Sequence, residues 1–218
     1  MSIPNILAQR YASEDMTIIW SSENKVLLER ELWIAVLQAQ REVGQDIPEE
    51  AIAAYQRTKN DINLESILER EKIVKHDVKA RIEEFCDLAG YQLIHKGMTS
   101  RDLTENIEQL QIRQSVELIQ IQAVAALVHL AKLSEQYSET PITGRTHNVA
   151  AQVTTVGKRF ANAAEEMLLA FLNLEDIIRT YPMRGVKGPV GTQQDLSLIH
   201  ICRCRRYSLC RSRWSPYH

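Results

Sequence analysis

One long stretch without helix-breaking residues constrains the fold of this chain more than any other feature. Between Gly97 and Pro141 the sequence contains neither glycine nor proline. At about 1.5 Å per residue, a helix over most of this stretch is about 50 Å long. Because residues 124–130 are apolar on nearly every face, we expect this helix to lie inside a bundle. Its apolar residues at helical spacing are Leu103, Ile107, Leu110, Val116, Leu118, Ile121, Val124, Leu127, Leu130 and Leu133.

Shorter helices are predicted before this stretch, and a second long helix after it. Capping residues and helix-ending glycines delimit several of them. The predicted segments are residues 21–44, a helix that opens at 46–48, residues 64–73, a helix capped by Asp77 that ends at Gly90, and residues 150–181. We find no run of useful length that alternates apolar and polar residues, and no hairpin pattern. The predicted fold class is therefore all-α.

A short segment joins the two predicted long helices and contains Pro141 and the sequence GRTH at residues 144–147. Short connections place consecutive helices side by side and antiparallel. Two helices cannot cover their own apolar faces. We therefore expect further helices, from the rest of the protein or from other subunits, to complete the bundle.

Charge is unevenly distributed along the chain. Its 218 residues include 26 basic and 28 acidic ones, a formal net charge of −2. Five of the basic residues are arginines within the last 16 positions, so the body of the chain is acidic. An acidic body argues against general nucleic-acid binding. Three of the four cysteines also lie near the C-terminus, and the single remaining Cys86 makes no disulfide framework, which is typical of the cytoplasm.

Residues 196–218 differ from the rest of the chain, because they show no helical period and contain no acidic residue. The run LSLIHI and the residues after it resemble one reading frame of a widely used transposon-type sequencing adaptor. The spacing of Cys202, Cys204 and Cys210 fits no standard zinc pattern. We therefore treat this segment as a non-native tail.

Residues 183–192, with the sequence MRGVKGPVGT, contain three glycines. A phosphate-binding Walker loop needs a serine or threonine after its lysine. Here Gly188 follows Lys187. The segment is therefore predicted to be a glycine-rich turn that ends the second long helix.

No targeting or membrane segment is expected. The first 16 residues carry polar and charged groups early, unlike a signal peptide. The apolar run at residues 121–133 is too short to span a bilayer, and it includes His129 and Lys132. We therefore expect a soluble, cytoplasmic protein that does not contact a membrane.

Polar residues at the start of the long predicted helix form a candidate site. Thr99 and Asp102 have the spacing of a capping box, and Ser100 adds a second hydroxyl. These residues can simply satisfy the free N–H groups of the first helical turn. Alternatively, the two hydroxyls bind a carboxylate or phosphate together with those N–H groups and the positive end of the helix dipole. The residue types alone leave both interpretations open.

Three histidines, His76, His95 and His147, lie at predicted helix boundaries beside polar neighbours. Side chains from distant segments converge at helix ends, and histidine transfers protons near neutral pH. The alternative is metal binding, but none of the three shows the i, i+4 pairing that places two ligands on one helical face. His129, in the apolar part of the long helix, is expected to be a core residue. We expect no metal and no cofactor.

Four motifs in order carry a resemblance to a known family. They are RY at residues 10–11, HD at residues 76–77, TSRDLTEN from residue 99 and GRTHNVAAQVTTVGKR from residue 144. In this order and spacing they resemble the adenylosuccinate lyase family of the fumarase/aspartase superfamily, and most closely its actinobacterial members. The resemblance extends over residues 1–195. RY and HD match nucleotide-binding positions that separate this family from other members of the superfamily.

The resemblance implies a reaction and a role for each matching residue. Members of the family release fumarate from adenylosuccinate by β-elimination, giving AMP, and cleave the succinylated carboxamide ribotide of purine synthesis in the same way. By resemblance, His147 is the general acid and His76 supports it. Thr99 and Ser100 hold a carboxylate of the succinyl group, and His95 binds the phosphate of the nucleotide substrate. The further nucleotide contacts implied are Arg10, Tyr11, Lys75, His76 and Asp77.

The chain departs from the family pattern at two points. Lys75 stands where the family more often has arginine or asparagine. In addition, the family's base is a serine on a mobile loop of the form SSxMPxKRNP, and this motif does not occur in the sequence. Active sites of the family combine residues from three subunits of a homotetramer. A chain with only some of these parts is expected to be inactive alone.

The predicted organisation has three parts: an N-terminal helical lyase domain at residues 1–111, the first long helices of a truncated central bundle at 112–195, and the tail at 196–218. Three functions remain open. They are an adenylosuccinate lyase, another lyase of the superfamily such as an argininosuccinate lyase, and a non-catalytic helical scaffold. RY and HD favour the first. Loss of turnover on replacing His147 would separate both enzymes from the scaffold.

Overall fold

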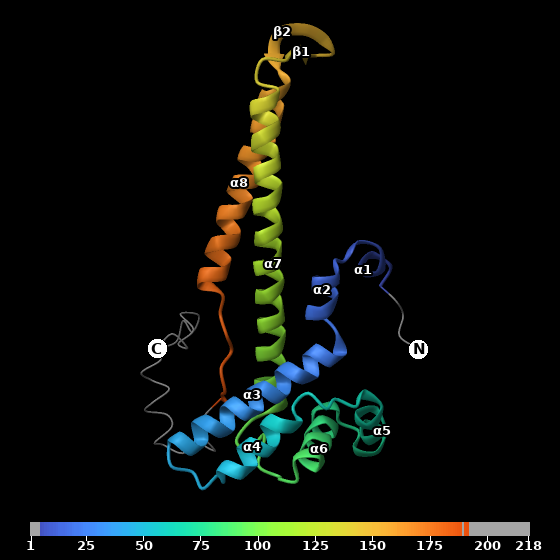
Figure 1. The fold of residues 1–218 in the computed structure, drawn as a ribbon, viewed down its shortest axis with the longest axis vertical. Coiled ribbons are helices and arrows are strands. Elements are labelled where there is room, and N and C mark those ends of the chain that lie inside the picture. Colours follow the sequence, from blue (N-terminus) through green and yellow to red (C-terminus); the bar gives the residue numbers. More distant parts are fainter. Residues whose placement is uncertain (1–4, 189, 192–218) are drawn as a thin grey trace. The chain divides into compact units, whose positions relative to one another are not determined.

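The computed structural model describes residues 5–188, 190 and 191 (Figure 1). The predicted tail at residues 196–218 lies outside them. The described chain divides into two compact units. The first consists of the residues up to Ile112 together with those from Pro182 onward, and the second is Arg113–Tyr181. Helices predominate, so the predicted all-α class is confirmed, with one short sheet as an exception.

The first unit contains short helices followed by the beginning of the longest one. Their bounds are α1 Ile6–Tyr11, α2 Glu14–Ile19, α3 Ser22–Glu42, α4 Glu49–Thr58, α5 Leu64–Val74, α6 Asp77–Ala89 and α7 Ser100–Gln136. The predicted segments before the long stretch correspond to α3, α4, α5 and α6. The sequence did not separate α1 from α2, because a helix of six residues is too short to show a helical period.

Capping residues explain where several of these helices begin and end. The side chain of Ser21 accepts the backbone N–H three residues on at the start of α3, and Asn63 does the same for α5. Helix α6 ends at Gly90, whose φ of 75° is a left-handed conformation that glycine adopts without strain. These local signals made α3, α5 and α6 predictable.

Aromatic side chains from α3, α4 and α6 form the core of the first unit. Trp33, Tyr55 and Phe85 are each at most 1% exposed. The ring centroid of Phe85 lies 6.3 Å from that of Trp33 and 4.9 Å from that of Tyr55. Leu37 and Leu103 pack in the same cluster. The start of α7 is therefore fixed against the helices that precede it.

A buried charge pair crosses this core. Arg30 on α3 lies 2.6 Å from the carboxylate of Glu84 on α6, and their side chains are 0% and 3% exposed. The Arg30 guanidinium also donates to the carbonyl oxygens of Thr58 and Lys59 at the end of α4. It lies 4.6 Å from the centroid of the Phe85 ring. One side chain thus ties three helices together.

The second unit contains the rest of α7, a two-stranded sheet and another long helix. Strand β1 is Pro141–Thr146, strand β2 is Val149–Thr155 and helix α8 is Val156–Thr180. The strands pair antiparallel, with a bulge between Gly144 and Arg145. The prediction that the chain has no strand is therefore wrong at this point, and residues 150–181 are not helical throughout.

His147 and Asn148 form the turn between the two strands. Both have positive φ, 49° and 64°. Two-residue hairpin turns of type I′ need positive φ at both positions, and asparagine and histidine adopt it more readily than most residues. Asn-Gly is the commoner signal for such a turn, and the His-Asn pair gave a weaker one. The polar composition of β1 removed the remaining cue.

A close backbone approach fixes the point where α8 begins. The N–H of Gly157 donates to the carbonyl oxygen of Tyr137 at 2.9 Å. A Cβ on Gly157 would lie 2.4 Å from the carbonyl oxygen of Ser134 and 2.8 Å from the Cα of Ser138. Only glycine allows this approach. The end of α7 and the start of α8 are therefore joined by backbone contact.

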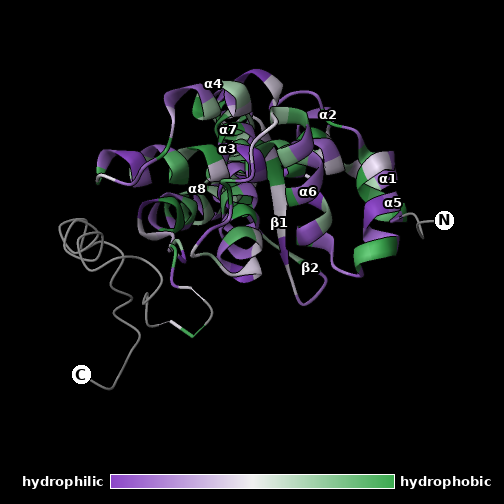
Figure 2. Cartoon of the chain, turned by 90° about the horizontal axis from the view of Figure 1, so that it is seen from below, coloured by the Kyte–Doolittle hydropathy of each residue, from purple (hydrophilic) through white to green (hydrophobic). Residues whose placement is uncertain are grey.

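Apolar side chains remain exposed along the helices of the second unit. Ile121 on α7 is 68% exposed and Leu169 on α8 is 59% exposed. Hydrophobic and hydrophilic residues both occur along α8 (Figure 2). His129, which was predicted to be a core residue, is exposed. The predicted burial of α7 on every side is therefore not reached within the single chain.

Helix α7 also corrects the expectation that no segment is long enough for a membrane. Its 37 residues include an 18-residue window with a mean hydropathy of 1.5, and none of that window is buried. By length and composition alone such a helix can span a bilayer. Core helices of soluble proteins share both properties, so length and composition do not by themselves indicate a span.

Candidate functional site

The starts of α6 and α7 come together at the predicted site. Nε2 of His76 lies 3.4 Å from the hydroxyl oxygen of Ser100, 24 positions further along the sequence. His76 is the N-cap of α6, because its Nδ1 accepts the backbone N–H of Lys79 at 3.4 Å. The prediction that Asp77 caps this helix is wrong, since Asp77 is its first residue. A ring nitrogen satisfies the helix end more weakly than a carboxylate, and the Asp77 side chain is left for other contacts.

Asp77 faces the His76 ring and is held by an arginine. Its Oδ1 lies 3.3 Å from Nδ1 of His76, and its Oδ2 accepts a hydrogen bond from Arg81 at 2.8 Å. Burial raises the pKa of Asp77, but hydrogen bonds from the Val78 N–H and from Arg81 outweigh it, and the pKa lies below its ordinary value. A carboxylate therefore stands beside His76 at neutral pH.

His95 lies in a left-handed turn and packs against the core. Its φ is 65°. Its Nδ1 accepts the indole N–H of Trp33 at 3.1 Å, so the neutral ring must carry its proton on Nε2. Burial lowers the pKa of His95, and the nearby charge of Asp102 opposes this only in part. His95 is therefore a neutral side chain that offers an Nε2–H donor.

Thr99 and Asp102 form half of the predicted capping box. Oδ2 of Asp102 accepts the N–H of Thr99 at 3.1 Å. The N–H of Asp102 bonds instead to the carbonyl oxygen of Thr99, at 2.9 Å. The cap therefore does not use the Thr99 hydroxyl. Thr99 and Ser100 are both partly exposed beside the first N–H groups of α7, which is the arrangement that anion binding requires.

Asp102 also fixes the glycine-containing segment that follows α8. Its carboxylate is 0% exposed. It accepts the N–H groups of Lys187 at 3.1 Å and Gly188 at 2.8 Å, and Nε of Arg184 lies 3.4 Å from it. The sequence predicted only a turn at residues 183–192. In the structure, this segment is bound to the first turn of α7, next to Thr99 and Ser100.

Further polar groups on α7 hold the same segment. The amide of Asn106 donates to the carbonyl oxygen of Gly185 at 3.1 Å and accepts its N–H at 3.0 Å. Gln109 accepts the N–H of Arg184 at 2.7 Å, and Glu105 forms an ion pair with the Arg184 side chain. These contacts were not predicted from the sequence. The sequence does contain a signal for them. Polar residues recur every three or four positions, at 102, 105, 106 and 109, on one face of a helix otherwise expected to be apolar.

Other predicted binding residues are exposed at helix ends. Arg10 and Tyr11 close α1, and Tyr11 is 77% exposed. In the part of the chain that the structure describes, neither makes a hydrogen bond or ion pair with another predicted site residue. Lys75 ends α5 in a left-handed conformation with φ 56°, directly before His76. The structure therefore brings together His76, Asp77 and Ser100, with Lys75 adjacent in sequence.

His147 belongs to the second unit. It is exposed at the first turn position of the hairpin between β1 and β2. The side chain of Arg145 donates to the carbonyl oxygen of Asn148 at 3.3 Å, which helps to close the turn. The GRTH motif is therefore a strand end and a tight turn, and the histidine is displayed at its end.

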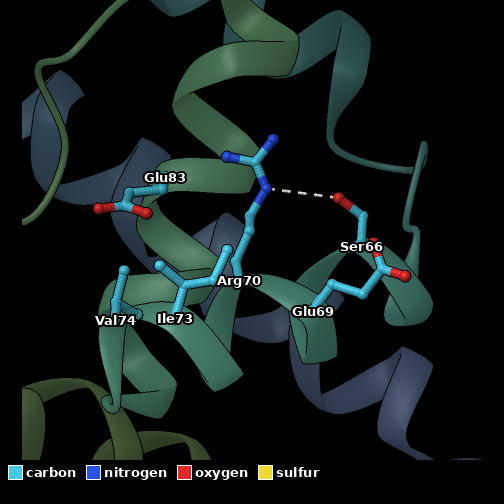
Figure 3. Close-up of a pocket in the computed structure, with 6 residues that line it drawn as sticks. All are labelled: Ser66, Glu69, Arg70, Ile73, Val74 and Glu83. Atoms are coloured by element: carbon cyan, nitrogen blue, oxygen red, sulfur yellow. Dashed lines mark hydrogen bonds between the residues drawn. The ribbon is translucent and has the colours of Figure 1, made fainter.

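A cavity in the first unit lies apart from these residues. It has a volume of about 400 Å³ between α5 and α6 (Figure 3). Along α5, the Arg70 guanidinium donates to the Ser66 hydroxyl at 3.3 Å, and both residues line the cavity. It contains no predicted site residue. Among residues 5–188, 190 and 191, no group of three or more His, Cys, Asp or Glu is arranged to hold a metal ion.

Comparison with a solved structure supports the observed fold. A fumarate lyase from Mesorhizobium sp. BNC1 matches this chain with a TM-score of 0.73 at 24% sequence identity, over 88% of this chain and 47% of that one. The chain therefore shares the helical fold of that structure over the matched part. This agrees with the fold class that the sequence predicted.

Comparison with sequences defines the family. The family described as "Lyase" matches residues 10–194, and the chain belongs to it. An adenylosuccinate lyase from Saccharomyces cerevisiae is 34% identical over 200 residues, which is 89% of this chain and 42% of that protein. An N-acetyl-S-(2-succino)cysteine lyase from Dickeya dadantii is 26% identical over 86% of this chain and 42% of that protein. The chain thus spans about two-fifths of the length of these relatives, and the predicted resemblance to the superfamily is confirmed.

Proposed function

We propose that this chain is part of a lyase that cleaves adenylosuccinate to AMP and fumarate. The contact between His76 and Ser100 carries this proposal, because it joins two motifs of the adenylosuccinate lyase family where α6 and α7 begin. The 34% identity to an adenylosuccinate lyase supports this substrate over that of other superfamily members. We extend the proposal to the succinylated carboxamide ribotide of purine synthesis.

The elimination requires a base for a carbon-bound proton, groups that stabilise the dianionic carboxylate, and an acid for the leaving nitrogen. Thr99 and Ser100 are assigned to the carboxylate, because they lie at the positive end of α7. His147 is the acid, and His76 supports it. The base of the family is a serine in an SSxMPxKRNP loop, which this sequence does not contain.

The remaining site residues are assigned to the nucleotide. His95 suits a phosphate, because Trp33 leaves the proton of the neutral ring on Nε2, where it can donate to a phosphate oxygen. The reaction is an elimination without electron transfer, and the proposal includes no metal or cofactor. The other nucleotide contacts in the proposal are Arg10, Tyr11, Lys75, His76 and Asp77.

We further propose that the complete protein is a soluble, cytoplasmic homotetramer with active sites shared among three subunits. Exposed apolar side chains on α7 and α8 support this, because surfaces of this kind need a partner. The acidic body of the chain argues against binding to nucleic acid or an anionic membrane. In this proposal residues 1–111 form the N-terminal domain and 112–195 begin the central bundle.

Two assays of AMP and fumarate formation from adenylosuccinate test the proposal. The 218-residue chain is expected to show no useful turnover alone, and turnover at a normal enzymatic rate would contradict this. A read of the source DNA across the codon for Asp195 is expected to continue into further helices and an SSxMPxKRNP loop. The protein completed in this way is expected to be active.

His147→Ala in the completed enzyme tests the assigned acid. We expect a loss of about 10²-fold or more in turnover, the size typical of general acid catalysis, with folding retained. His129→Ala is the matched control, because His129 is also an exposed histidine of the second unit. Equal turnover in both variants would favour a non-catalytic scaffold. Turnover of argininosuccinate in place of adenylosuccinate would favour another lyase of the superfamily.

A further inference from the structure

The neutral ring of His76 has a partner for either position of its proton. With the proton on Nε2, Nδ1 accepts the N–H of Lys79 and Nε2 donates to Ser100. With the proton on Nδ1, the ring faces the Asp77 carboxylate 3.3 Å away, and Nε2 accepts from Ser100. The negative charge on Asp77 favours the second state. The strength of that charge therefore decides between the two tautomers.

Asp77 is the outer end of a chain of charges that runs into the core. Nη2 of Arg81 lies 2.8 Å from Asp77, and Nε of the same guanidinium lies 2.7 Å from Oε2 of Glu29 on α3. The side chains of Arg81 and Glu29 are 13% and 0% exposed. One guanidinium thus lies between two carboxylates, and one of these carboxylates contacts His76.

Glu29 is buried without a well-formed hydrogen bond to its carboxylate among the described residues. The Arg81 Nε is close to Oε2 but is not aligned to donate to it. The other charged groups that face Glu29 are Lys25 on α3, Asp77 on α6 and Glu108 on α7. Burial raises the pKa of Glu29 to about 7, against the opposing charges of Arg81 and Lys25. Its charge therefore changes near neutral pH.

We propose that Glu29 is a positioning residue for His76, which selects through Arg81 and Asp77 the ring nitrogen that carries the proton. An ionised Glu29 offsets part of the positive charge of Arg81. The Asp77 carboxylate then attracts the proton of His76 more strongly, and the proton lies on Nδ1. When Glu29 is neutral, the positive charge of Arg81 offsets the negative charge of Asp77 more fully, and the proton of His76 moves to Nε2. Only the Nδ1-protonated ring leaves Nε2 able to accept a proton. The importance of this for turnover rests on the proposed function, in which His76 takes part.

Nitrogen NMR of the full 218-residue chain, labelled with ¹⁵N-histidine, reports the tautomer directly. The chain has six histidines, and the signal of His76 is assigned from its loss in His76→Gln. At pH 8, above the pKa of Glu29 of about 7, we expect the neutral His76 ring to be mainly Nδ1-protonated. In Glu29→Gln, which is always neutral, we expect the ratio of the Nδ1–H to the Nε2–H form to fall about fivefold.

Glu31→Gln is the matched control for this experiment. It makes the same substitution on the same helix, at a half-exposed residue that pairs with Lys59 at 2.7 Å. We expect it to leave the His76 ratio unchanged. The signal of His95, whose tautomer Trp33 fixes, reports whether the fold of the first unit is intact.

Asp77→Asn provides a second variant at a half-exposed position, where folding does not depend on a buried charge. It is expected to move the proton of His76 to Nε2 more completely than Glu29→Gln does. An unchanged ratio in either variant, with the His95 signal in place, would overturn the proposal. Because the measurement needs no turnover, it can fail while the proposed reaction stands, and it can succeed if adenylosuccinate is not the substrate.

Discussion

The two units of the chain differ in how far their apolar side chains are buried. Every hydrophobic residue that is buried in the described chain lies in the first unit, between Val26 and Ile107. In the second unit, large apolar side chains such as Ile121 and Leu169 are more than half exposed. The first unit therefore carries its own core, whereas the helices of the second unit leave apolar side chains exposed that need a further surface to cover them.

The ion pairs of the two units also differ in burial. The first unit buries Arg30 with Glu84 and places Glu29 against Arg81. The ion pairs described within the second unit, such as that of Arg113 with Glu117, are exposed. Buried charges destabilise a structure unless their partners are fixed, so they mark a region whose packing is complete. Changes in the first unit should therefore alter stability, and changes in the second should mainly alter association.

The largest expected effect comes from breaking the buried pair of the first unit. Arg30→Met leaves the Glu84 carboxylate buried without its partner and removes two hydrogen bonds to the end of α4. We expect the free energy of unfolding to fall by about 3–5 kcal/mol. Urea titration followed by circular dichroism measures this, supported by hydrogen exchange in α3, α4 and α6.

The exposed pair of Lys59 and Glu31 provides the control for this comparison. Lys59→Met removes a contact of 2.7 Å between half-exposed side chains. We expect a change of at most about 1 kcal/mol. If Arg30→Met were equally mild, the buried pair would not be what holds the three helices together.

A smaller effect is expected from the pH dependence of Glu29. Its pKa is raised from 4.5 to about 7 in the folded chain, so between these values the folded state binds more protons than the unfolded state. Stability from this group is therefore greatest at low pH and is lost as the pH rises towards 7 and above. Glu29→Gln removes this dependence. From pH 5 to pH 8 the free energy of unfolding should fall by about 2 kcal/mol less in Glu29→Gln than in the unaltered chain. Urea titration at both pH values measures this.

The pKa of the neighbouring Asp77 shifts in the opposite direction, so Asp77 does not disturb the measurement on Glu29. Asp77 has a lowered pKa, so its contribution is present at neutral pH and is lost only as the pH falls below its ordinary value near 3.8. It does not titrate between pH 5 and pH 8. Glu31→Gln, at a half-exposed position, should follow the pH profile of the unaltered chain. A Glu29→Gln profile as steep as the unaltered one would show that Glu29 is ionised throughout.

Local signals explain which parts of the fold were predictable. Ser21, Asn63 and Gly90 delimit their helices through neighbours within four residues, and the sequence displays such neighbours directly. The hairpin was missed because its turn uses positive φ at His147 and Asn148, where glycine is the usual signal. The exposure of His129 was missed for a different reason. An apolar helix predicts that something covers it, but not that the cover belongs to the same chain.

The candidate site also has a part that was predictable from local sequence and a part that was not. The motifs predicted His76, Ser100 and His95, and the structure brings the first two within 3.4 Å. The contacts that fix the site join residues distant in sequence, such as Asp102 with Gly188 across 86 positions. No spacing rule links such residues. Only the folded chain reveals that Asp102 holds the segment after α8 as well as capping α7.

Overpacking the junction of α7 and α8 tests the close backbone contact at Gly157 in the second unit. In Gly157→Ala the new methyl group would lie 2.4 Å from the Ser134 carbonyl oxygen, so the backbone must shift. We expect a loss of about 1–3 kcal/mol, confined to this unit. Faster hydrogen exchange in α8, with unchanged exchange in α3 and α6, is the expected result. Asn162→Ala, at an exposed position of α8, is the control and should change little.

The smallest expected effect on stability is also the sharpest test of what covers the second unit. Ile121→Lys places a charge on an exposed apolar position of α7 and should change the unfolding free energy of the chain by no more than about 0.5 kcal/mol. If other copies of the chain cover this face, the same change must weaken self-association, which sedimentation equilibrium measures. Gln122→Lys adds the same charge at the next exposed position and should leave association unaltered. Equal association of both variants with the unaltered chain would mean that Ile121 stays exposed in the assembly, and that the apolar face of α7 is covered elsewhere along its length.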